Sequence, residues 1–220
     1  MMRFAALMMS LSLTVACSPE PSSAHAKAKA PAEPAKAEAP VANCTYTVSD
    51  AKPGWTAYKF TEKAPVAGTF TTFKMSEAAS AASLTDALKG ITMEIDGASI
   101  ESGNPARNIT VSSLYFGKFT PTPQIKGAVV SATGDDQKGT VVINIGMNGV
   151  SKDVEFAYTV SAEGALQAKA TMEMKDFSLQ GAFDSIHAAC QGLHTGKDGV
   201  AKTWTDVALL VDASVKKACK

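Results

Sequence analysis

One stretch of the sequence decides the fold: Ile95-Asp-Gly-Ala-Ser-Ile-Glu-Ser-Gly-Asn-Pro-Ala-Arg-Asn-Ile-Thr-Val-Ser-Ser-Leu-Tyr-Phe-Gly-Lys-Phe119. It begins as a strand with apolar residues on one face, and the segment Gly103-Asn-Pro105 stops that strand. A short amphipathic stretch follows and ends in three aromatic residues, Tyr115, Phe116 and Phe119. A strand that leads into an aromatic-rich crossover is unusual in a sandwich of short hairpins. The stretch therefore predicts a barrel with an elaborated mouth.

The rest of the pattern is that of a β protein. Alternating apolar and polar residues predict eight strands, and Asn148-Gly149 is typical of a two-residue hairpin turn. Long alternating strands in one sheet favour closure, because a closed sheet has no free edges. We therefore predict an all-β fold with two short helices, an eight-stranded antiparallel up-and-down barrel. The predicted strands are 46–49 with 55–62 (kinked at Pro53-Gly54), 66–75, 91–95, 124–132, 141–147, 154–160, 166–174 and 203–215, and the helices are 76–89 (capped by Ser83) and 178–193.

The inward face of these strands is apolar but contains few bulky residues. Ala168, Ala170 and several methionines stand where a tightly filled core would have Leu or Phe. Methionine is flexible and suits a surface that accepts a variable apolar guest. A core filled by the protein's own side chains is the alternative. Alternation alone predicts as inward-facing Met93, Ile95, Ile143, Ile145, Phe156, Tyr158, Met172, Met174 and Leu209, and we add Tyr115, Phe116 and Phe119 as candidates for gating the cavity.

The N-terminal residues are typical of an exported lipoprotein. A short basic segment and the apolar run 4–16 precede Cys17, and the run is too short to span a bilayer comfortably. We predict a signal peptide at 1–17 with lipidation of Cys17, although Thr14 stands where Leu is usual. A plain secretory signal that removes Cys17 is the alternative. Both place the other cysteines in an oxidising compartment.

A spacer separates this signal from the folded domain. Residues 18–43 are rich in Ala and Pro and contain no aromatic residue, so the sequence predicts a disordered tether. The folded domain is predicted at 44–220. Ser18 directly after Cys17 suggests sorting to the outer membrane, on the periplasmic side of the cell envelope.

The chain resembles the YceI-like, polyisoprenoid-binding family of secreted bacterial proteins. The opening stretch is similar to the centre of that family, and other segments match it in the same order. The resemblance implies a lipocalin-like barrel that holds a long isoprenoid tail, such as a quinone or a polyprenyl phosphate, and it implies no reaction. The family often has a histidine at the position of Asn148 and another in its first strand, so headgroup recognition is expected to differ here if those histidines contact the ligand. The other matching segments are Trp55-Thr-Ala-Tyr-Lys-Phe60, Gly68-Thr-Phe-Thr-Thr-Phe73, Pro123-Gln-Ile125, Asn148-Gly-Val-Ser-Lys-Asp-Val154 and Asp176-Phe177.

Barrel geometry suggests a pairing for the cysteines that remain after lipidation. In an eight-strand meander, the start of the first strand and the end of the last strand lie at the same end of the barrel. If these strands pair, Cys44 and Cys219 become neighbours and form a disulfide, which leaves Cys190 as a free and buried thiol. The competing pair is Cys44 with Cys190, which requires the second helix to fold back along the barrel.

One cluster has the residue types of a metal site. His187, Cys190 and His194 share one face of the second predicted helix, and Cys and His are ligands for zinc, copper or haem iron. Three ligands on one short helix converge poorly on one ion, however, and Gly192 and Gly196 interrupt the helix. We therefore predict no metal site and keep these residues as an alternative.

Composition and motifs exclude several other functions. The chain has 21 basic and 21 acidic residues, so it lacks the excess of positive charge that would suggest nucleic-acid binding. It has no Gly-x-Ser-x-Gly nucleophile motif and no phosphate-binding loop, so we predict no enzymatic activity and no cofactor. We expect a carrier or sequestering protein whose partners are an isoprenoid lipid and, through the acyl anchor, the membrane. The alternatives are a stress-response or interaction module with a filled barrel, and the metal- or haem-binding protein. A homodimer is left open.

Overall fold

Ten strand segments form one antiparallel sheet in a computed structural model, which describes residues 43–220. The signal peptide, the lipidation of Cys17 and the tether predicted before residue 43 lie outside the described residues. The segments are β1 (Cys44–Lys59), β2 (Ala64–Phe70), β3 (Phe73–Met75), β4 (Thr92–Asp96), β5 (Ile100–Glu101), β6 (Gln124–Gly134), β7 (Lys138–Met147), β8 (Val150–Val160), β9 (Ala165–Glu173) and β10 (Asp206–Cys219).

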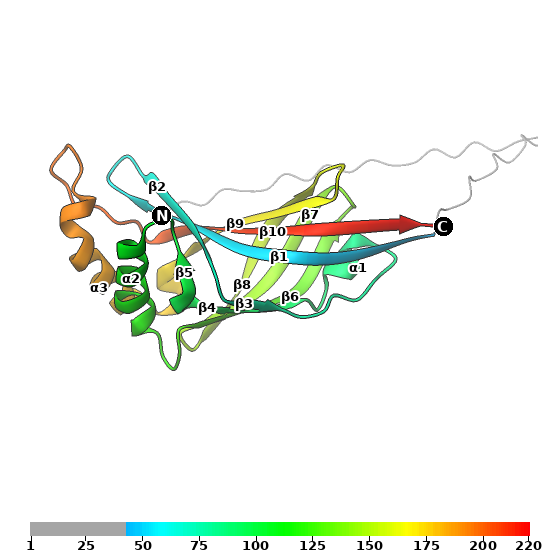
Figure 1. Cartoon of the computed structure of the whole chain (residues 1–220), viewed down its shortest axis with the longest axis horizontal. Coiled ribbons are helices and arrows are strands. Elements are labelled where there is room, and N and C mark those ends of the chain that lie inside the picture. Colours follow the sequence, from blue (N-terminus) through cyan, green and yellow to red (C-terminus); the bar gives the residue numbers. More distant parts are fainter. Residues whose placement is uncertain (1–42) are drawn as a thin grey trace, which may run out of the picture. The chain divides into compact units, whose positions relative to one another are not determined.

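The ten segments are eight strands, two of which are interrupted. Only residues 71–72 separate β2 from β3, and only the short turn 97–99 separates β4 from β5. β2 pairs with β5, and β3 pairs with β4. The interrupted strand β2–β3 therefore lies beside the interrupted strand β4–β5, and the two outer segments of the sheet, β3 and β5, belong to these neighbouring strands. Backbone hydrogen bonds from Thr71 N to Ser99 O and from Asp96 N to Thr72 O cross the interruption. The predicted antiparallel, lipocalin-like fold is confirmed (Figure 1), but the curled sheet has ten strand segments instead of the predicted eight strands, because two of the predicted strands are interrupted.

Three α-helices are present where two were predicted. The helix predicted at 76–89 is only α1 (Leu84–Leu88), with Ser83 as its N-cap, as expected. The second predicted helix is α3 (Gln180–Cys190), which continues as the 3-10 turn η4 (Gln191–His194). The amphipathic stretch after Pro105 is itself a helix, α2 (Pro105–Leu114). The other 3-10 turns are η1 (Gly97–Ser99), η2 (Phe116–Lys118) and η3 (Met174–Phe177).

The first strand differs from its prediction in one detail. The predicted kink at Pro53-Gly54 is wrong, because the irregularity lies four residues earlier. Ser49 is opposite Ser214 and Lys52 is opposite Asp212, so two residues of β1 face one of β10, and Asp50 has a φ of 55°. This is a β-bulge, which bends a strand locally. The hairpin turn at Asn148-Gly149 is confirmed, with positive φ at both residues.

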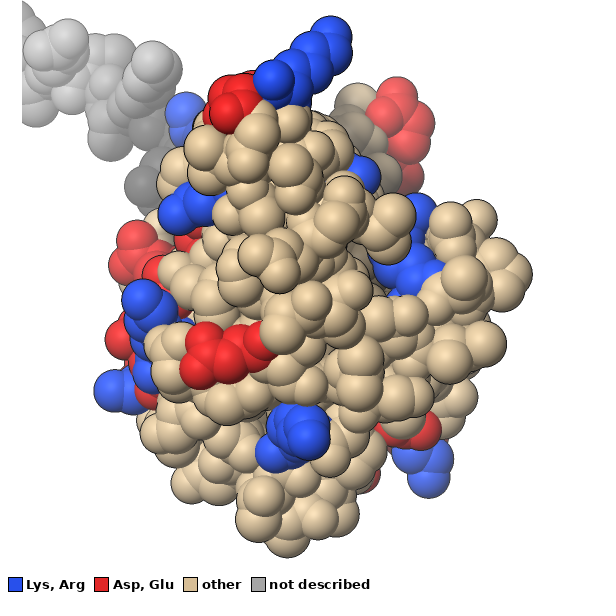
Figure 2. Space-filling model, turned by 90° about the vertical axis from the view of Figure 1, so that its left-hand side faces the viewer, with Lys and Arg blue, Asp and Glu red and all other residues tan. Residues whose placement is uncertain are grey.

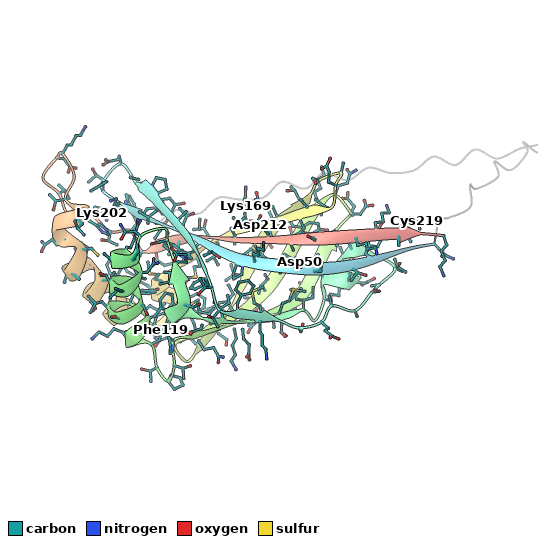
Figure 3. The ribbon with its side chains drawn as sticks, in the orientation of Figure 1. Asp50, Phe119, Lys169, Lys202, Asp212 and Cys219 are labelled. Atoms are coloured by element: carbon teal, nitrogen blue, oxygen red, sulfur yellow. A yellow bond between two sulfur atoms is a disulfide. The ribbon has the colours of Figure 1, made fainter. Side chains whose placement is uncertain are left out.

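The first and last strands pair and bring the two ends of the domain together. β1 and β10 pair from Cys44 opposite Cys219 to Thr56 opposite Ala208. The disulfide between Cys44 and Cys219 is present, as predicted. Cys190 is the free cysteine of the described residues, and it is partly exposed rather than buried. Figure 3 places Cys219 at one end of the barrel and Lys202 and Phe119 towards the other.

Different helices lie at the two ends of the barrel. α1 lies at the end that carries Cys219, and it buries Leu84, Ala87 and Leu88. α2 and α3 lie together at the opposite end (Figure 1). None of the helices between residues 43 and 220 is long and apolar enough to cross a membrane.

Candidate functional site

The barrel encloses one large cavity with a volume of about 620 Å³. Small-molecule sites typically have volumes of roughly 300–1,000 Å³, so the space suits a ligand of that class. Along β10, lining residues run from Val207 to Ala213, which corresponds to roughly 20 Å of strand. The cavity is therefore long and follows the barrel axis. Apolar side chains form nearly all of its wall.

All twelve residues predicted from the sequence as ligand-binding line this cavity. Alternation placed the strand residues on the correct face, because side chains of a strand point to opposite faces in turn. Contact of these residues with a ligand stays a prediction. The twelve are Met93, Ile95, Tyr115, Phe116, Phe119, Ile143, Ile145, Phe156, Tyr158, Met172, Met174 and Leu209.

Large side chains close the cavity towards α1. Leu88, Leu166 and Tyr158 line it there, and each of them is buried. The hydroxyl of Tyr158 donates a hydrogen bond of 2.7 Å to the carbonyl oxygen of Asp135, which fixes the ring. Burial is the largest cause that raises the pKa of Tyr158, and the negative charges of Asp135 and Asp136 raise it further. We therefore expect an apolar guest to enter from the other end, where α2 and α3 lie.

A capped helix forms one side of the mouth. Asn104 is the N-cap of α2, where its side chain accepts a hydrogen bond of 3.0 Å from the backbone N–H of Arg107, and Pro105 occupies the first turn. Asn108 fixes the helix to β5, because its amide donates to Glu101 and accepts from Ser102. α2 is thus held across the barrel end by its own sequence, and Arg107 lines the cavity there.

The aromatic residues after α2 form the wall beneath this helix. The ring centroids of Phe116 lie 5.9 Å from Phe70 and 5.0 Å from Phe119, and both distances are typical of aromatic packing. A Cβ at Gly97 would overlap the ring of Phe116, so only glycine allows this approach. Phe116 and Phe119 are buried and fixed, which fits a wall better than a gate. A gating role for the three aromatic residues stays a prediction.

Tyr115 brings a polar group to this apolar wall. Burial raises its pKa, so its hydroxyl stays protonated. The hydroxyl has no hydrogen-bond partner among residues 43–220, and the residue lines the cavity. No fully buried side-chain oxygen or nitrogen of these residues lacks a partner, so the Tyr115 oxygen is accessible. The Tyr115 hydroxyl is therefore available to donate a hydrogen bond to a guest.

The charged residues that line the cavity are all cationic. They are Lys59, Arg107 and Lys126, and no Asp or Glu of the described residues lines it. The Lys126 ammonium is exposed and lies 3.5 Å from a carboxylate oxygen of Glu94. Lys59 and Arg107 have no ion-pair partner within residues 43–220. Two uncompensated positive charges therefore stand at the mouth.

The two histidines of the domain meet at one threonine rather than at an ion site. The Nδ1 atoms of His187 and His194 lie 3.0 Å and 2.7 Å from the hydroxyl oxygen of Thr203. Thr203 has one hydroxyl proton, so it donates to at most one of the two rings and accepts from the other. Burial is the largest cause that lowers the pKa of His194, and the charges of Lys59, His187 and Arg107 lower it further. The lowered pKa keeps the His194 ring neutral near pH 7.

Cys190 completes the cluster that was considered for metal binding. It lines the cavity, and burial raises the pKa of its thiol, which keeps it protonated. Within residues 43–220, no group of three or more His, Cys, Asp or Glu side chains is arranged to hold a metal ion. The structure thus brings His187 and His194 together through a hydrogen-bonded threonine.

Asn148, which stands where the resembling family often has histidine, has a structural role. Its amide nitrogen donates to the carbonyl oxygens of Phe177 and Ser178, and its side-chain oxygen accepts from the backbone N–H of Thr120. These three bonds tie the β7–β8 hairpin to two other loops. Asn148 does not line the cavity.

Several residues of the mouth were missed by sequence reasoning. Lys59, Thr203 and Trp204 line the cavity at the point where the end of β1 meets the segment before β10. The indole N–H of Trp204 donates to the carbonyl oxygen of Phe60 at 2.8 Å, which joins the two segments. No local pattern marks these residues, because they come from segments more than 140 positions apart. Arg107 had a usable signal, since Asn104-Pro105 is typical of a helix start.

Comparisons with known proteins agree with this architecture. The model of the YceI-like domain matches residues 44–212. No curated protein sequence matched the chain. The crystal structure of BcnA from Burkholderia cenocepacia is 17% identical over 76% of this chain and 99% of its own, with a TM-score of 0.52. A polyisoprenoid binding domain from Saccharophagus degradans, implicated in plant cell wall breakdown, is 12% identical over 80% and 99%, with a TM-score of 0.54. The Campylobacter jejuni YCEI protein is 17% identical over 71% and 86%, with a TM-score of 0.52.

Proposed function

This chain belongs to the YceI-like domain family, and from that premise we propose that it binds, sequesters or carries an isoprenoid lipid in its barrel cavity without catalysing a reaction. The observation that carries the proposal is the cavity itself. A volume of about 620 Å³ with an almost wholly apolar wall matches a long hydrocarbon chain. The structure from Saccharophagus degradans is that of a polyisoprenoid binding domain, which supports the same class of ligand.

The cavity favours this proposal over a filled barrel. A barrel that served only as an interaction module would bury its own large side chains along the axis. Here small residues, such as Ala168 and Gly127, contribute to the wall, and the space between the walls stays open. Apolar cavities of this kind stay dry and accept apolar guests.

The charge at the mouth favours a phosphate headgroup over a quinone ring. Lys59 and Arg107 line the mouth without an acidic partner among the described residues. A hydrogen bond to a charged group is worth roughly 1.5–3 kcal/mol. A polyprenyl phosphate uses these cations, whereas a neutral quinone leaves them unpaired.

Two experiments test the proposal. Organic extraction of the full chain purified from its native envelope, followed by mass spectrometry, identifies a bound lipid. A barrel that is empty and also fails to bind quinones and polyprenyl phosphates refutes the function. Binding of a polyprenol and of its monophosphate then tests the headgroup. We expect Arg107→Gln to weaken the phosphate about tenfold and to leave the polyprenol unchanged, and Lys169→Gln on the outer face serves as the control (Figure 3). Equal effects on both lipids contradict the headgroup assignment.

The location is a separate part of the proposal. The apolar segment before Cys17 supports export, lipidation of Cys17 and an outer-membrane anchor facing the periplasm. Metabolic labelling with an alkyne fatty acid should mark the chain and should fail for Cys17→Ser. Labelling that persists in Cys17→Ser rejects the acyl anchor.

A further inference from the structure

Exposed apolar side chains gather at the mouth of the barrel. Four large apolar residues of the described chain are strongly exposed: Leu193 at 75%, Ile109 at 69%, Val130 at 52% and Val200 at 47%. Val130 lies on β6, in the wall of the barrel. The other three lie on α2, on η4 and in the loop that follows η4, which are the elements at the mouth end (Figure 1). Leu193 also lines the cavity, so it is part of the rim.

The surface around these residues carries little charge. The exposed side of α2 consists of Pro105, Ala106, Ile109 and Ser113, none of which is ionisable. The C-terminal part of α3 and η4 is similar, with Ala188, Ala189 and Leu193 exposed. Figure 2 looks at this end of the molecule, and uncharged residues cover most of it. Apolar residues that cluster around an opening mark an interaction site, whereas single ones scattered over a surface do not.

The rim also carries positive charge that no acidic residue neutralises. Lys59 and Arg107 line the mouth, and neither has an ion-pair partner within residues 43–220. Lys197, in the loop next to Val200, is exposed as well. Two exposed acids of this end are already hydrogen-bonded: Asp184 accepts from Gln180 on the first half of α3, and Asp198, in the same loop as Lys197 and Val200, accepts from Thr61. Apolar side chains beside cations are the combination that binds the interface of an anionic bilayer.

We propose that the mouth end of the barrel docks on an anionic lipid bilayer, with Ile109, Leu193 and Val200 inserted among the acyl chains. The inference rests on the proposed lipid-binding function, because a membrane is the place from which such a ligand is taken and to which it returns. In the docked state the cavity opens directly into the acyl region. An isoprenoid tail then enters or leaves without crossing water, whose contact with apolar surface costs roughly 25 cal/mol per Å².

Hydrogen–deuterium exchange of the full chain, with and without vesicles, tests the docking face. We use phosphatidylcholine vesicles with and without phosphatidylglycerol. Docking predicts slower exchange in peptides covering 105–114 and 188–201, stronger with phosphatidylglycerol, and no change around Val130 in β6. The readout is local, so binding through residues before 43 alone leaves these peptides unprotected and overturns the proposal. Protection that grows with protein concentration in the absence of vesicles overturns it in favour of a second copy of the chain.

Matched variants give the second arm. Ile109 and Val200 do not line the cavity, so Ile109→Ser with Val200→Ser should keep ligand loading. We expect it to raise the lipid concentration needed for half-maximal protection at least about tenfold, since two apolar side chains no longer move out of water on docking. Val130→Ser, which removes an exposed apolar side chain from the barrel wall, should change nothing. An equal effect of both variants rejects the docking face.

Ligand loading is measured in the same samples. If the wild-type chain carries no lipid but vesicles still slow hydrogen exchange in peptides 105–114 and 188–201, the proposed function is refuted and the docking face is supported. Normal loading with no protection refutes the docking face alone. The two inferences therefore fail separately.

Discussion

The disulfide between Cys44 and Cys219 should supply a large part of the stability of the domain. It closes a loop of 175 residues, which is nearly the whole folded chain. In the chain-entropy model, a cross-link over this length removes about 17 cal/mol/K from the unfolded chain, or about 5 kcal/mol at 25 °C. Domains of this kind typically have a total stability of about 5–15 kcal/mol. Replacing both cysteines by serine should therefore lower the unfolding free energy by about 3–5 kcal/mol.

The site of the disulfide makes the experiment easy to interpret. Cys219 is exposed and Cys44 is only partly buried, so Cys44→Ser with Cys219→Ser removes little packing. Urea denaturation followed by fluorescence of the two tryptophans gives the free energy of each variant. Cys190→Ser is the matched control, because this thiol forms no disulfide. We expect Cys190→Ser to change the unfolding free energy by less than about 1 kcal/mol.

Two results would refute this reasoning. A loss below about 1 kcal/mol in the double variant contradicts the loop-entropy argument, since native disulfides of small domains typically contribute 2–5 kcal/mol. A loss in Cys190→Ser as large as in the double variant contradicts the pairing itself. Peptide mapping without reducing agent checks the second result, because a linked peptide that contains Cys190 would identify the competing pair.

Three further predictions concern the cavity, pH and packing. Ala168→Phe places a ring in the cavity and should weaken isoprenoid binding at least about tenfold, measured by displacement of a fluorescent lipid, whereas Lys169→Phe adds the same ring to the outer face and should have no effect. The unfolding free energy should decrease as the pH falls below about 6.5. The pKa of His194 is lowered in the folded protein, so the unfolded chain takes up the proton first. An equally steep decrease of the unfolding free energy in His194→Gln contradicts this explanation. A Cβ at Gly68 overlaps a tryptophan ring, so Gly68→Ala should cost about 1–3 kcal/mol in urea denaturation, whereas Gly127→Ala meets only ordinary contacts and should be nearly neutral.

Alternation along the strands predicted the interior of the barrel correctly because it is a local property. Side chains of a strand point to opposite faces in turn, so Ile143 and Ile145 could be placed inside from their neighbours alone. The same holds for the turn at Asn148-Gly149, whose positive φ angles suit these two residues. Pairing of the first and last strands followed from counting strands, and it placed the disulfide.

The errors arose where tertiary contacts override local preference. The Ala-rich segment before Ser83 favours a helix by composition. In the structure, the backbone of Ala81 instead exchanges two hydrogen bonds with Tyr46, at 2.8 Å and 3.0 Å, and this bridge holds the segment extended. The opposite error was made at Gly103-Asn-Pro105, which was interpreted only as the stop of a strand, whereas Asn104 caps α2 and Pro105 begins it. The sequence signal was present there, but its second meaning was missed.

The mouth could not be predicted from any single segment. Lys59, Arg107 and His194 come from three distant parts of the chain, and only the closure of the barrel brings them to one opening. Their individual sequence surroundings are ordinary. Charge at a site of this kind becomes visible only once the fold is known.

The arrangement of the barrel ends has a consequence for how the domain can be joined to other sequences. Asn43 and Lys220, the ends of the described chain, lie beside the disulfide, and α2 and α3 lie at the opposite end (Figure 1). A leader, a linker or a whole fusion partner attached at Asn43 or Lys220 therefore adds mass where no guest passes. Natural variation or protein engineering can therefore exchange the sequences attached to the two ends of the domain without changing the cavity or its guest.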